Sequence, residues 1–206
     1  MAAVSSSGPP EGGHYVYMTR HDRLPPIPPD QLSADQQAVV DEMMAGPRGG
    51  VIGPFVATLR SPELTRRLQR LGEYIRYHAA LPEKLREMAI LLTAREWKQG
   101  VEWDVHAPLA AKAGLSDGVI AAIAQGHPPA SLGPDELLVY SLFTELHRTH
   151  AVGDSTYDAA CREFGEQGVI DLIALIGYYT TLAMIMNVAR TALPADKTPV
   201  LRPLAR

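Results

Sequence analysis

The residues whose types and spacing most strongly suggest chemistry are Gln99, Glu102 and His106. They are three and seven positions apart, so on an α-helix their side chains project from one face. A further acid, Glu87, lies earlier in the chain, in a strongly apolar segment. An imidazole and two carboxylates brought together between two helices can accept and deliver protons.

Glu87 and His106 are predicted to face each other across a helical hairpin. If the turn falls near Lys98, the two helices run antiparallel, and the two residues differ in height by only about 5 Å. Packed helices lie roughly 8–10 Å apart, a gap that two long side chains bridge. One alternative for Glu87 stays open, because an acid in the first turns of a helix is also favoured by the helix dipole at the surface.

Glu102 and His106, at positions i and i+4, can hydrogen-bond, and the carboxylate would then orient the imidazole or raise its basicity. Taken singly, each residue is more often structural: a satisfied histidine, or a solvated glutamate. A metal is a third interpretation. A carboxylate-bridged di-iron bundle, however, needs two Glu-x-x-His motifs, which we do not find. We therefore expect no metal and no cofactor.

The helices that would position these residues are predicted from capping signals and apolar spacing. Ser33-x-x-Gln36 is a capping box, Ser61 and Asp154 stand as N-caps, and Pro108 predicts a kink or a restart just after His106. Nothing is typical of a strand. We predict an all-α domain of about seven helices, with helical segments at about 33–45, 61–75, 82–94, 99–113, 116–124, 134–150, 154–165 and 169–193.

The organisation of the chain is predicted as one domain with a tail at each end. Residues 1–22 are rich in Ser, Gly and Pro and are expected to be a disordered tail; 23–193 form the domain, and 194–206 a loosely attached tail. The segment Leu24-Pro-Pro-Ile27-Pro-Pro is expected to be extended. It would strap itself to its own domain, with binding to a proline-reading partner as the alternative.

Composition narrows the function classes. The 206 residues carry a net charge of −4 without basic runs, so nucleic acid is not an expected partner. No uninterrupted apolar stretch of membrane-spanning length is present, and the first residues lack a basic and an apolar region. We expect neither a membrane partner nor a signal peptide. The single cysteine, Cys161, excludes an internal disulfide and fits a cytoplasmic setting.

The chain resembles the carboxymuconolactone decarboxylase and alkylhydroperoxidase D-like superfamily. The resemblance covers about residues 60 to 190, and is sharpest from Leu81-Pro-Glu-Lys-Leu-Arg-Glu87 to His106-Ala-Pro-Leu-Ala-Ala-Lys-Ala-Gly114-Leu. It implies an all-α alkylhydroperoxidase D-like bundle that assembles as a homo-oligomer, either a trimer or a hexamer. It does not by itself specify one activity.

The resemblance also separates two chemistries. The peroxidase branch carries a Cys-x-x-Cys pair at positions that fall here on Gln99 and Glu102, so disulfide-cycling peroxidase chemistry is disfavoured. The decarboxylase branch implies a carbon–carbon lyase that removes CO₂ from a small cyclic (lactone) carboxylic acid without a cofactor. We expect His106 to donate the proton. Glu102 would orient the His106 imidazole, and Glu87 would support both residues from the facing helix.

Substrate binding is less well defined by the sequence. Gln99 and Trp103 are the predicted substrate contacts. Arg60, Arg95 and Arg190 are candidates to hold a substrate carboxylate. Tyr178, Tyr179 and Asn187 interrupt the apolar last helix and would either line a cavity or serve core hydrogen bonding or an oligomer interface.

Two other functions stay open. The same groups would serve an isomerase or a ring-opening enzyme acting on a related unsaturated acid. From a different class, the chain could be a non-catalytic oligomeric binding or scaffold protein whose polar cluster only satisfies a buried core.

Overall fold

The computed structural model describes residues 22–194 and 196–201, and in these ranges the protein is all-helical, as predicted. Residues 1–21, which make up nearly all of the predicted N-terminal tail, lie outside the described residues. No strand occurs in the part that is described. A short 3₁₀ helix at Pro29–Gln31 precedes eight α-helices: α1 (Ala34–Ala45), α2 (Pro54–Thr58), α3 (Pro62–Tyr77), α4 (Glu83–Glu96), α5 (Gly100–Lys112), α6 (Asp117–Gln125), α7 (Pro134–Thr149) and α8 (Asp154–Ala189).

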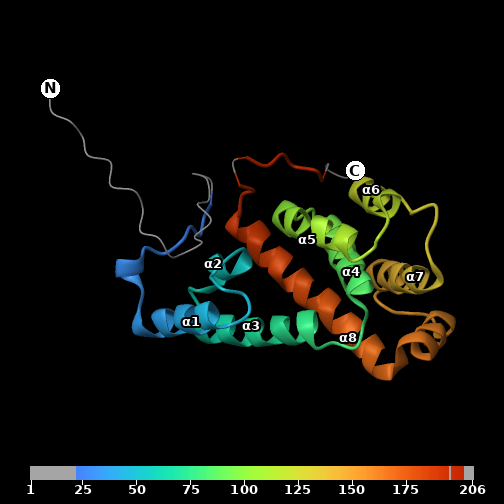
Figure 1. The fold of residues 1–206 in the computed structure, drawn as a ribbon, viewed down its shortest axis with the longest axis horizontal. Helices are drawn as coiled ribbons and strands as arrows, with labels where there is room; N and C mark the ends of the chain where they lie inside the picture. Colours follow the sequence, from blue (N-terminus) through green and yellow to red (C-terminus); the bar gives the residue numbers. More distant parts are fainter. Residues whose placement is uncertain (1–21, 195, 202–206) are drawn as a thin grey trace.

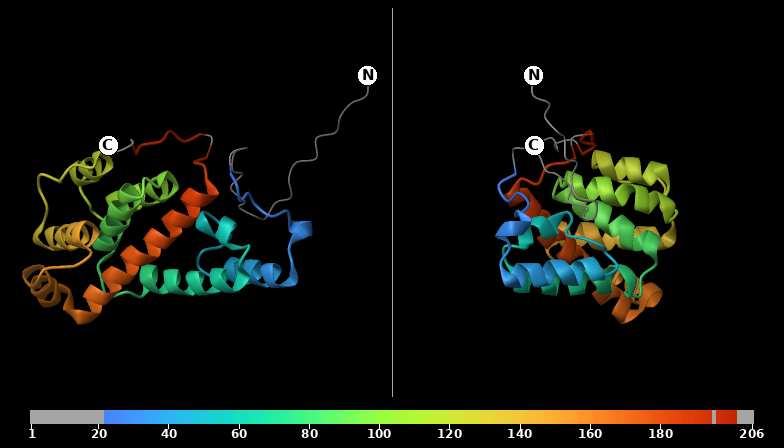
Figure 2. Two further views of the ribbon diagram at one scale, coloured as in Figure 1. Left: turned by 180° about the vertical axis from the view of Figure 1, so that it is seen from behind. Right: turned by 60° about the vertical axis from the view of Figure 1, so that its left-hand side comes forward.

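The long helix α8 crosses the middle of the molecule (Figure 1). Helices α1–α3 lie on one side of it and α4–α7 on the other, an arrangement also visible from behind (Figure 2). Helix α4 packs against α5, α6, α7 and α8. The core therefore forms where α4 meets α8, and its fully buried side chains include Leu85, Met88, Ile90, Leu91, Leu172, Leu175 and Met186.

The apolar character of α8 is explained by this central place. By length and composition alone, α8 would be able to cross a membrane. However, 56% of its most apolar 18-residue window is buried inside the fold. Packing thus accounts for the composition, and the absence of a membrane partner stays a prediction.

Some predicted helix boundaries are confirmed and others are wrong. The Ser33 and Gln36 capping box is present. Ser61 precedes α3, but its side chain makes no capping bond; its carbonyl accepts bonds from Thr65 instead. Residue Gly153, not Asp154, occupies the N-cap of α8. Two predicted helices merge into α8 across a bend at Gly165, whose φ of 70° favours a residue without a Cβ.

The N-terminal strap, the proline-rich segment that begins at Leu24, lies against its own domain, as predicted. Arg60 donates hydrogen bonds to the carbonyls of Leu24 (3.5 Å) and Pro25 (2.6 Å), and Ile27 packs on the core. The C-terminal segment is also tied down, because Lys197 lies 3.5 Å from the carboxylate of Asp104 on α5. Both ends of the described chain therefore contact the domain.

A tight turn joins α4 to α5 at the predicted place. Lys98 takes a left-handed conformation (φ 52°), and the backbone N–H of Gln99 donates to the Ala94 carbonyl at 2.8 Å. After the turn, α5 runs without interruption through Pro108, so the predicted restart after His106 is not observed. Pro108 still leaves the Asp104 carbonyl without its usual helical donor, because proline has no N–H.

Candidate active site

Glu87 and His106 meet in the interior of the hairpin formed by α4 and α5. The Nδ1 atom of His106 lies 2.7 Å from Oε2 of Glu87, and both side chains are almost completely buried. Glu87 sits in the second turn of α4, on the side that packs against α5. The surface alternative for Glu87 is therefore wrong, because the apolar stripe that continues from this residue carries it into the core.

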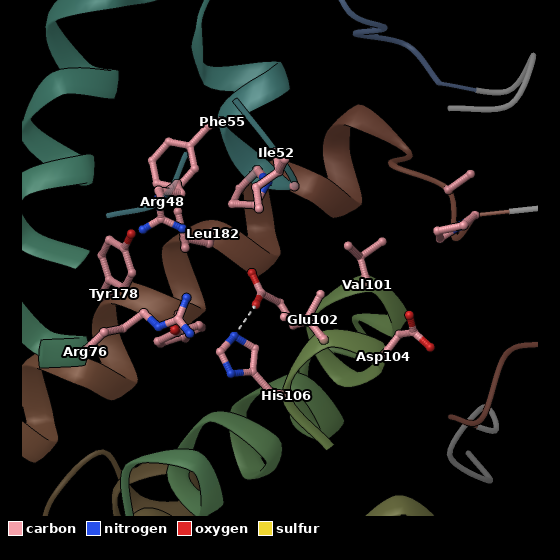
Figure 3. Close-up of a pocket in the computed structure, with 16 residues that line it drawn as sticks. Arg48, Ile52, Phe55, Arg76, Val101, Glu102, Asp104, His106, Tyr178 and Leu182 are labelled. Atoms are coloured by element: carbon pink, nitrogen blue, oxygen red, sulfur yellow. Dashed lines mark ion pairs between the residues drawn. The ribbon is translucent and has the colours of Figure 1, made fainter. Parts of the chain in front are cut away.

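Glu102 approaches the other nitrogen of the same imidazole. Its Oε2 atom lies 3.4 Å from His106 Nε2, as expected for residues one helical turn apart (Figure 3). Its second oxygen, Oε1, is buried and has no hydrogen-bond partner. A buried carboxylate oxygen without a partner is costly, so this oxygen is available to a donor that enters the cavity.

The two carboxylates favour the protonated form of His106. Burial lowers its pKa, but the hydrogen bonds and charges of Glu102 and Glu87 outweigh burial and raise it above its ordinary value. The ring of Tyr179 meets the imidazole edge-on, with ring centroids 5.2 Å apart. Burial holds the pKa of the Tyr179 hydroxyl well above its usual range, and this hydroxyl stays protonated at neutral pH.

A cavity of about 170 Å³ opens beside Glu102 and His106. This volume is below the roughly 300–1,000 Å³ of pockets that hold drug-sized ligands, so the cavity suits a small molecule. Its walls come from α2, α3, α5 and α8, from the loop before α2 and from the segment after α8. The residues around it are Arg48, Ile52, Gly53, Pro54, Phe55, Arg76, Val101, Glu102, Asp104, Val105, His106, Tyr178, Tyr179, Leu182, Ala192 and Pro194.

The predicted substrate contacts Gln99 and Trp103 do not line this cavity. Gln99 is the N-cap of α5 (φ −89°, ψ 100°), so the helical spacing that placed it beside Glu102 does not apply to it. Its side chain accepts from the Val101 amide and donates to Asn187 at 2.9 Å. Trp103 is buried in the core. Both have packing partners that explain their presence.

The arginines suggested by the sequence are also not the ones at the cavity. Arg60 holds the N-terminal strap, Arg95 lines a different hollow between α4 and α7, and Arg190 ends α8. Arg48 and Arg76 line the cavity instead. They were missed because neither lies in a catalytic-looking pattern, and only the fold brings them to α5.

The last helix contributes two tyrosines, whereas Asn187 has a structural partner. Tyr178 and Tyr179 both line the cavity, the interpretation that the sequence left as one of three. Asn187 donates to the Trp97 carbonyl at 2.9 Å and accepts from Gln99, which ties α8 to the turn before α5. Within the described ranges, no group of three or more His, Cys, Asp and Glu side chains is arranged to hold a metal ion.

Comparison with known proteins confirms the resemblance. Residues 62–143, from α3 to α7, match the model of the carboxymuconolactone decarboxylase family. This match and the all-helical fold are consistent with the carboxymuconolactone decarboxylase and alkylhydroperoxidase D-like superfamily that the sequence resembles. Gln99 and Glu102 stand where the resemblance would place the Cys-x-x-Cys pair of the peroxidase branch. A search of curated proteins gave no match.

Proposed function

We propose that the protein is a carbon–carbon lyase that decarboxylates a small cyclic (lactone) carboxylic acid by acid–base chemistry, without a cofactor. The observation that carries the proposal is the row of three groups, Glu87, His106 and Glu102, that ends in an unpartnered carboxylate oxygen at the cavity. Such a row moves a proton between the interior and a bound molecule.

The geometry favours Glu102, not His106, as the group that touches the substrate. Both nitrogens of His106 are directed at carboxylates, so the imidazole has no free donor for a ligand. Glu102 has a free oxygen at the cavity. His106 then relays the proton, and Glu87 holds its ring and favours its charged form. This order differs from the one expected from the sequence, where His106 was the direct donor.

The reaction balances with these groups alone. The bond between the carboxylate carbon and the ring breaks, CO₂ leaves, and the electron pair stays in the conjugated ring as a dienolate. Glu102 takes the proton of the His106 imidazolium and passes it to a ring carbon. A proton from water restores the imidazolium. One CO₂ is released and one proton is consumed in each turnover.

The open oxygen of Glu102 also bears on the alternatives. A satisfied polar core pairs nearly all of its buried acceptors, so an unpartnered oxygen beside a cavity favours a site that receives a ligand. An isomerase or ring-opening enzyme would use the same proton relay, and only the identity of the products separates it from a lyase.

The experiment is a screen for CO₂ release and ultraviolet change over lactones and unsaturated dicarboxylic acids. Wild-type protein is compared with His106→Ala and Glu102→Gln, and with His78→Ala and Glu83→Gln as exposed controls. Metal analysis on the same preparation tests the metal interpretation.

We expect both site variants to lose turnover and both controls to keep it. Turnover that survives His106→Ala overturns the relay. Turnover that survives Glu102→Gln but not His106→Ala makes His106 the direct donor. An ultraviolet change without CO₂ release would favour the isomerase or ring-opening alternative.

We also propose that the protein works as a cytoplasmic homo-oligomer, a trimer or a hexamer, on a small-molecule substrate. Large apolar side chains exposed on α8, including Ile170 and Val188, which are 64% and 65% exposed, support self-association. Light scattering coupled to size-exclusion chromatography measures the mass directly, and a monomer would contradict the proposal.

A further inference from the structure

Arg48 is held so that one end of its guanidinium faces the cavity. Its Nε atom donates to Oε1 of Gln69, a buried residue of α3, at 2.7 Å. The guanidinium carbon lies 4.4 Å from the centre of the Phe55 ring, which fixes its plane. The two terminal nitrogens form no hydrogen bond to described residues. A guanidinium fixed in this way loses little entropy when it binds a carboxylate.

Arg76, on α3, is the second cation at the cavity. It is half-buried and forms no ion pair or hydrogen bond with any described residue. Burial lowers its pKa, but Tyr179, Tyr77 and the carboxylates of Glu87 and Glu102 raise it above its ordinary value, so it stays charged. A half-buried guanidinium without an anion is costly, and a bound carboxylate would remove that cost.

Tyr178 adds a neutral donor to the same place. Its hydroxyl is buried and has no hydrogen-bond partner. Burial raises its pKa to about 12, so it remains protonated at neutral pH. A Cβ at Gly72 would come within 2.2 Å of this hydroxyl, which shows how closely the tyrosine approaches α3. Figure 3 shows Arg48, Arg76 and Tyr178 together on the side of the cavity that faces Glu102 and His106.

We propose that Arg48, Arg76 and Tyr178 form a carboxylate-binding subsite, and that it holds an acid group that the substrate keeps through the reaction. With imidazolium and both carboxylates charged, Glu87, Glu102, His106, Arg48 and Arg76 have a net charge of +1, which favours an anion. Asp104 also lines the cavity, but Lys197 lies 3.5 Å from its carboxylate and balances its charge. The unpartnered Tyr178 hydroxyl is directly suited to donate to a carboxylate oxygen.

The position of this acid group relative to the reacting one follows from the chemistry, and this step rests on the proposed decarboxylation. Two arginines bound to the departing carboxylate would stabilise the ground state more than the transition state, because that charge disappears as CO₂ forms. The anchored carboxylate is therefore the one that stays, and the departing one lies toward Glu102.

The subsite extends beyond the part of the chain that matches the family. Arg76 lies within residues 62–143, whereas Arg48 precedes them and Tyr178 follows them. The N-terminal segment with Arg48 is thus a part of the binding site as well as a cover for α3.

The test measures binding by titration calorimetry with 2-furoate, a small ring carboxylate, and with 2-furamide, its uncharged counterpart. The proteins are wild type, Arg48→Gln, Arg76→Gln, Tyr178→Phe and Arg67→Gln. Arg67 is an exposed arginine of α3, paired with Glu63 away from the cavity, and its variant controls for the loss of one positive charge. Circular dichroism checks that every variant is folded.

We expect 2-furoate to bind wild type roughly tenfold or more tightly than 2-furamide. Arg48→Gln and Arg76→Gln should each weaken 2-furoate roughly tenfold or more, and Tyr178→Phe several-fold. Arg67→Gln should bind like wild type. The proposal is overturned if wild type does not prefer the carboxylate, or if folded Arg48→Gln and Arg76→Gln bind it unchanged.

Glu102→Gln separates this proposal from the proposed reaction. This variant removes a negative charge from the cavity, so it should bind 2-furoate at least as tightly as wild type. Arginine-dependent binding by a wild-type protein that shows no turnover would support the subsite and count against the proposed reaction. Turnover that is lost in Glu102→Gln but unchanged in both arginine variants would support the proposed reaction and count against the subsite.

Discussion

Two buried carboxylates in this protein, Asp171 and Glu102, have opposite surroundings. Asp171 of α8 accepts from the Tyr74 hydroxyl at 3.1 Å and from the Ala80 amide at 3.0 Å, so both of its oxygens have donors. Glu102 shares one oxygen with His106 and leaves the other without a partner beside a cavity. Their exposures are nearly equal, 5% and 6%. Burial alone therefore does not distinguish these two acids; the missing donor does.

The largest expected effect is on turnover, and it should separate these two acids. Glu102→Gln keeps the size of the side chain but removes the transferable proton. We expect kcat to fall by about 100-fold or more, the usual worth of a positioned acid or base. Asp171→Asn should leave kcat within a few-fold of wild type, because Asp171 does not line the cavity. Both are measured on the substrate identified in the screen. Equal losses would contradict the distinction between the two sites.

Stability should show the reverse pattern. Asp171→Ala leaves the Ala80 amide and the Tyr74 hydroxyl without their acceptor, and we expect it to cost about 1–3 kcal/mol of unfolding free energy. Glu102→Gln should change stability little, because removing a buried charge with an unmet oxygen offsets the loss of its ion pair with His106. Urea unfolding followed by circular dichroism measures both. A strongly destabilised, inactive Glu102→Gln protein would favour the scaffold interpretation.

Stability should vary with pH because of His106, which lies beside Glu102, and not because of the site of Asp171. The pKa of His106 is raised in the folded protein. Its contribution to the unfolding free energy is therefore complete below the unfolded pKa of about 6.5 and is lost as pH rises through the folded pKa. The unfolding free energy should therefore fall with rising pH above about 6.5, by at most about 1.4 kcal/mol per pH unit.

Urea unfolding between pH 6 and pH 9 measures this slope. His106→Asn should remove its contribution, while Asp171→Asn should keep it. A slope that is unchanged in His106→Asn would show that other groups cause the pH dependence.

Local patterns were enough to predict the Glu87, Glu102 and His106 cluster. A single tight turn at Lys98 joins the two helices that carry it, so helical spacing and the rise per residue determine which side chains meet. The same reasoning misplaced Gln99, because the N-cap residue does not have helical dihedral angles. Trp103 was misplaced too: it follows Glu102 directly and so points to a different side of α5, into the core.

The residues on the opposite wall of the cavity could not be predicted from the sequence. Arg48, Arg76 and Tyr178 come from a loop, from α3 and from α8, and they meet only because α2 and α3 pack against α8. Contacts between residues that are far apart in sequence leave no periodic signal. The partners of Asp171 were missed for the same reason, since Tyr74 and Ala80 are more than 90 residues away.

Two glycines of α8, one of them at the bend that precedes Asp171, should affect stability in opposite directions when replaced by alanine. Gly165 has φ 70° and ψ 168°, a combination that only glycine adopts readily, so Gly165→Ala should destabilise by roughly 1–3 kcal/mol. Gly177 lies within helical α8, and a Cβ there would meet no atom within 4 Å. Gly177→Ala should therefore stabilise by about 0.5–1 kcal/mol.

Urea midpoints compare the two alanine variants directly. Changes of the same sign would contradict the assignment of the bend to Gly165. If the bend serves only to place Asp171 against Tyr74 and Ala80, Gly165→Ala should keep the turnover of wild type in its folded fraction. A loss of turnover would mean that the placement of α8 also controls the Tyr178 wall of the cavity, and that the two carboxylate sites are mechanically linked.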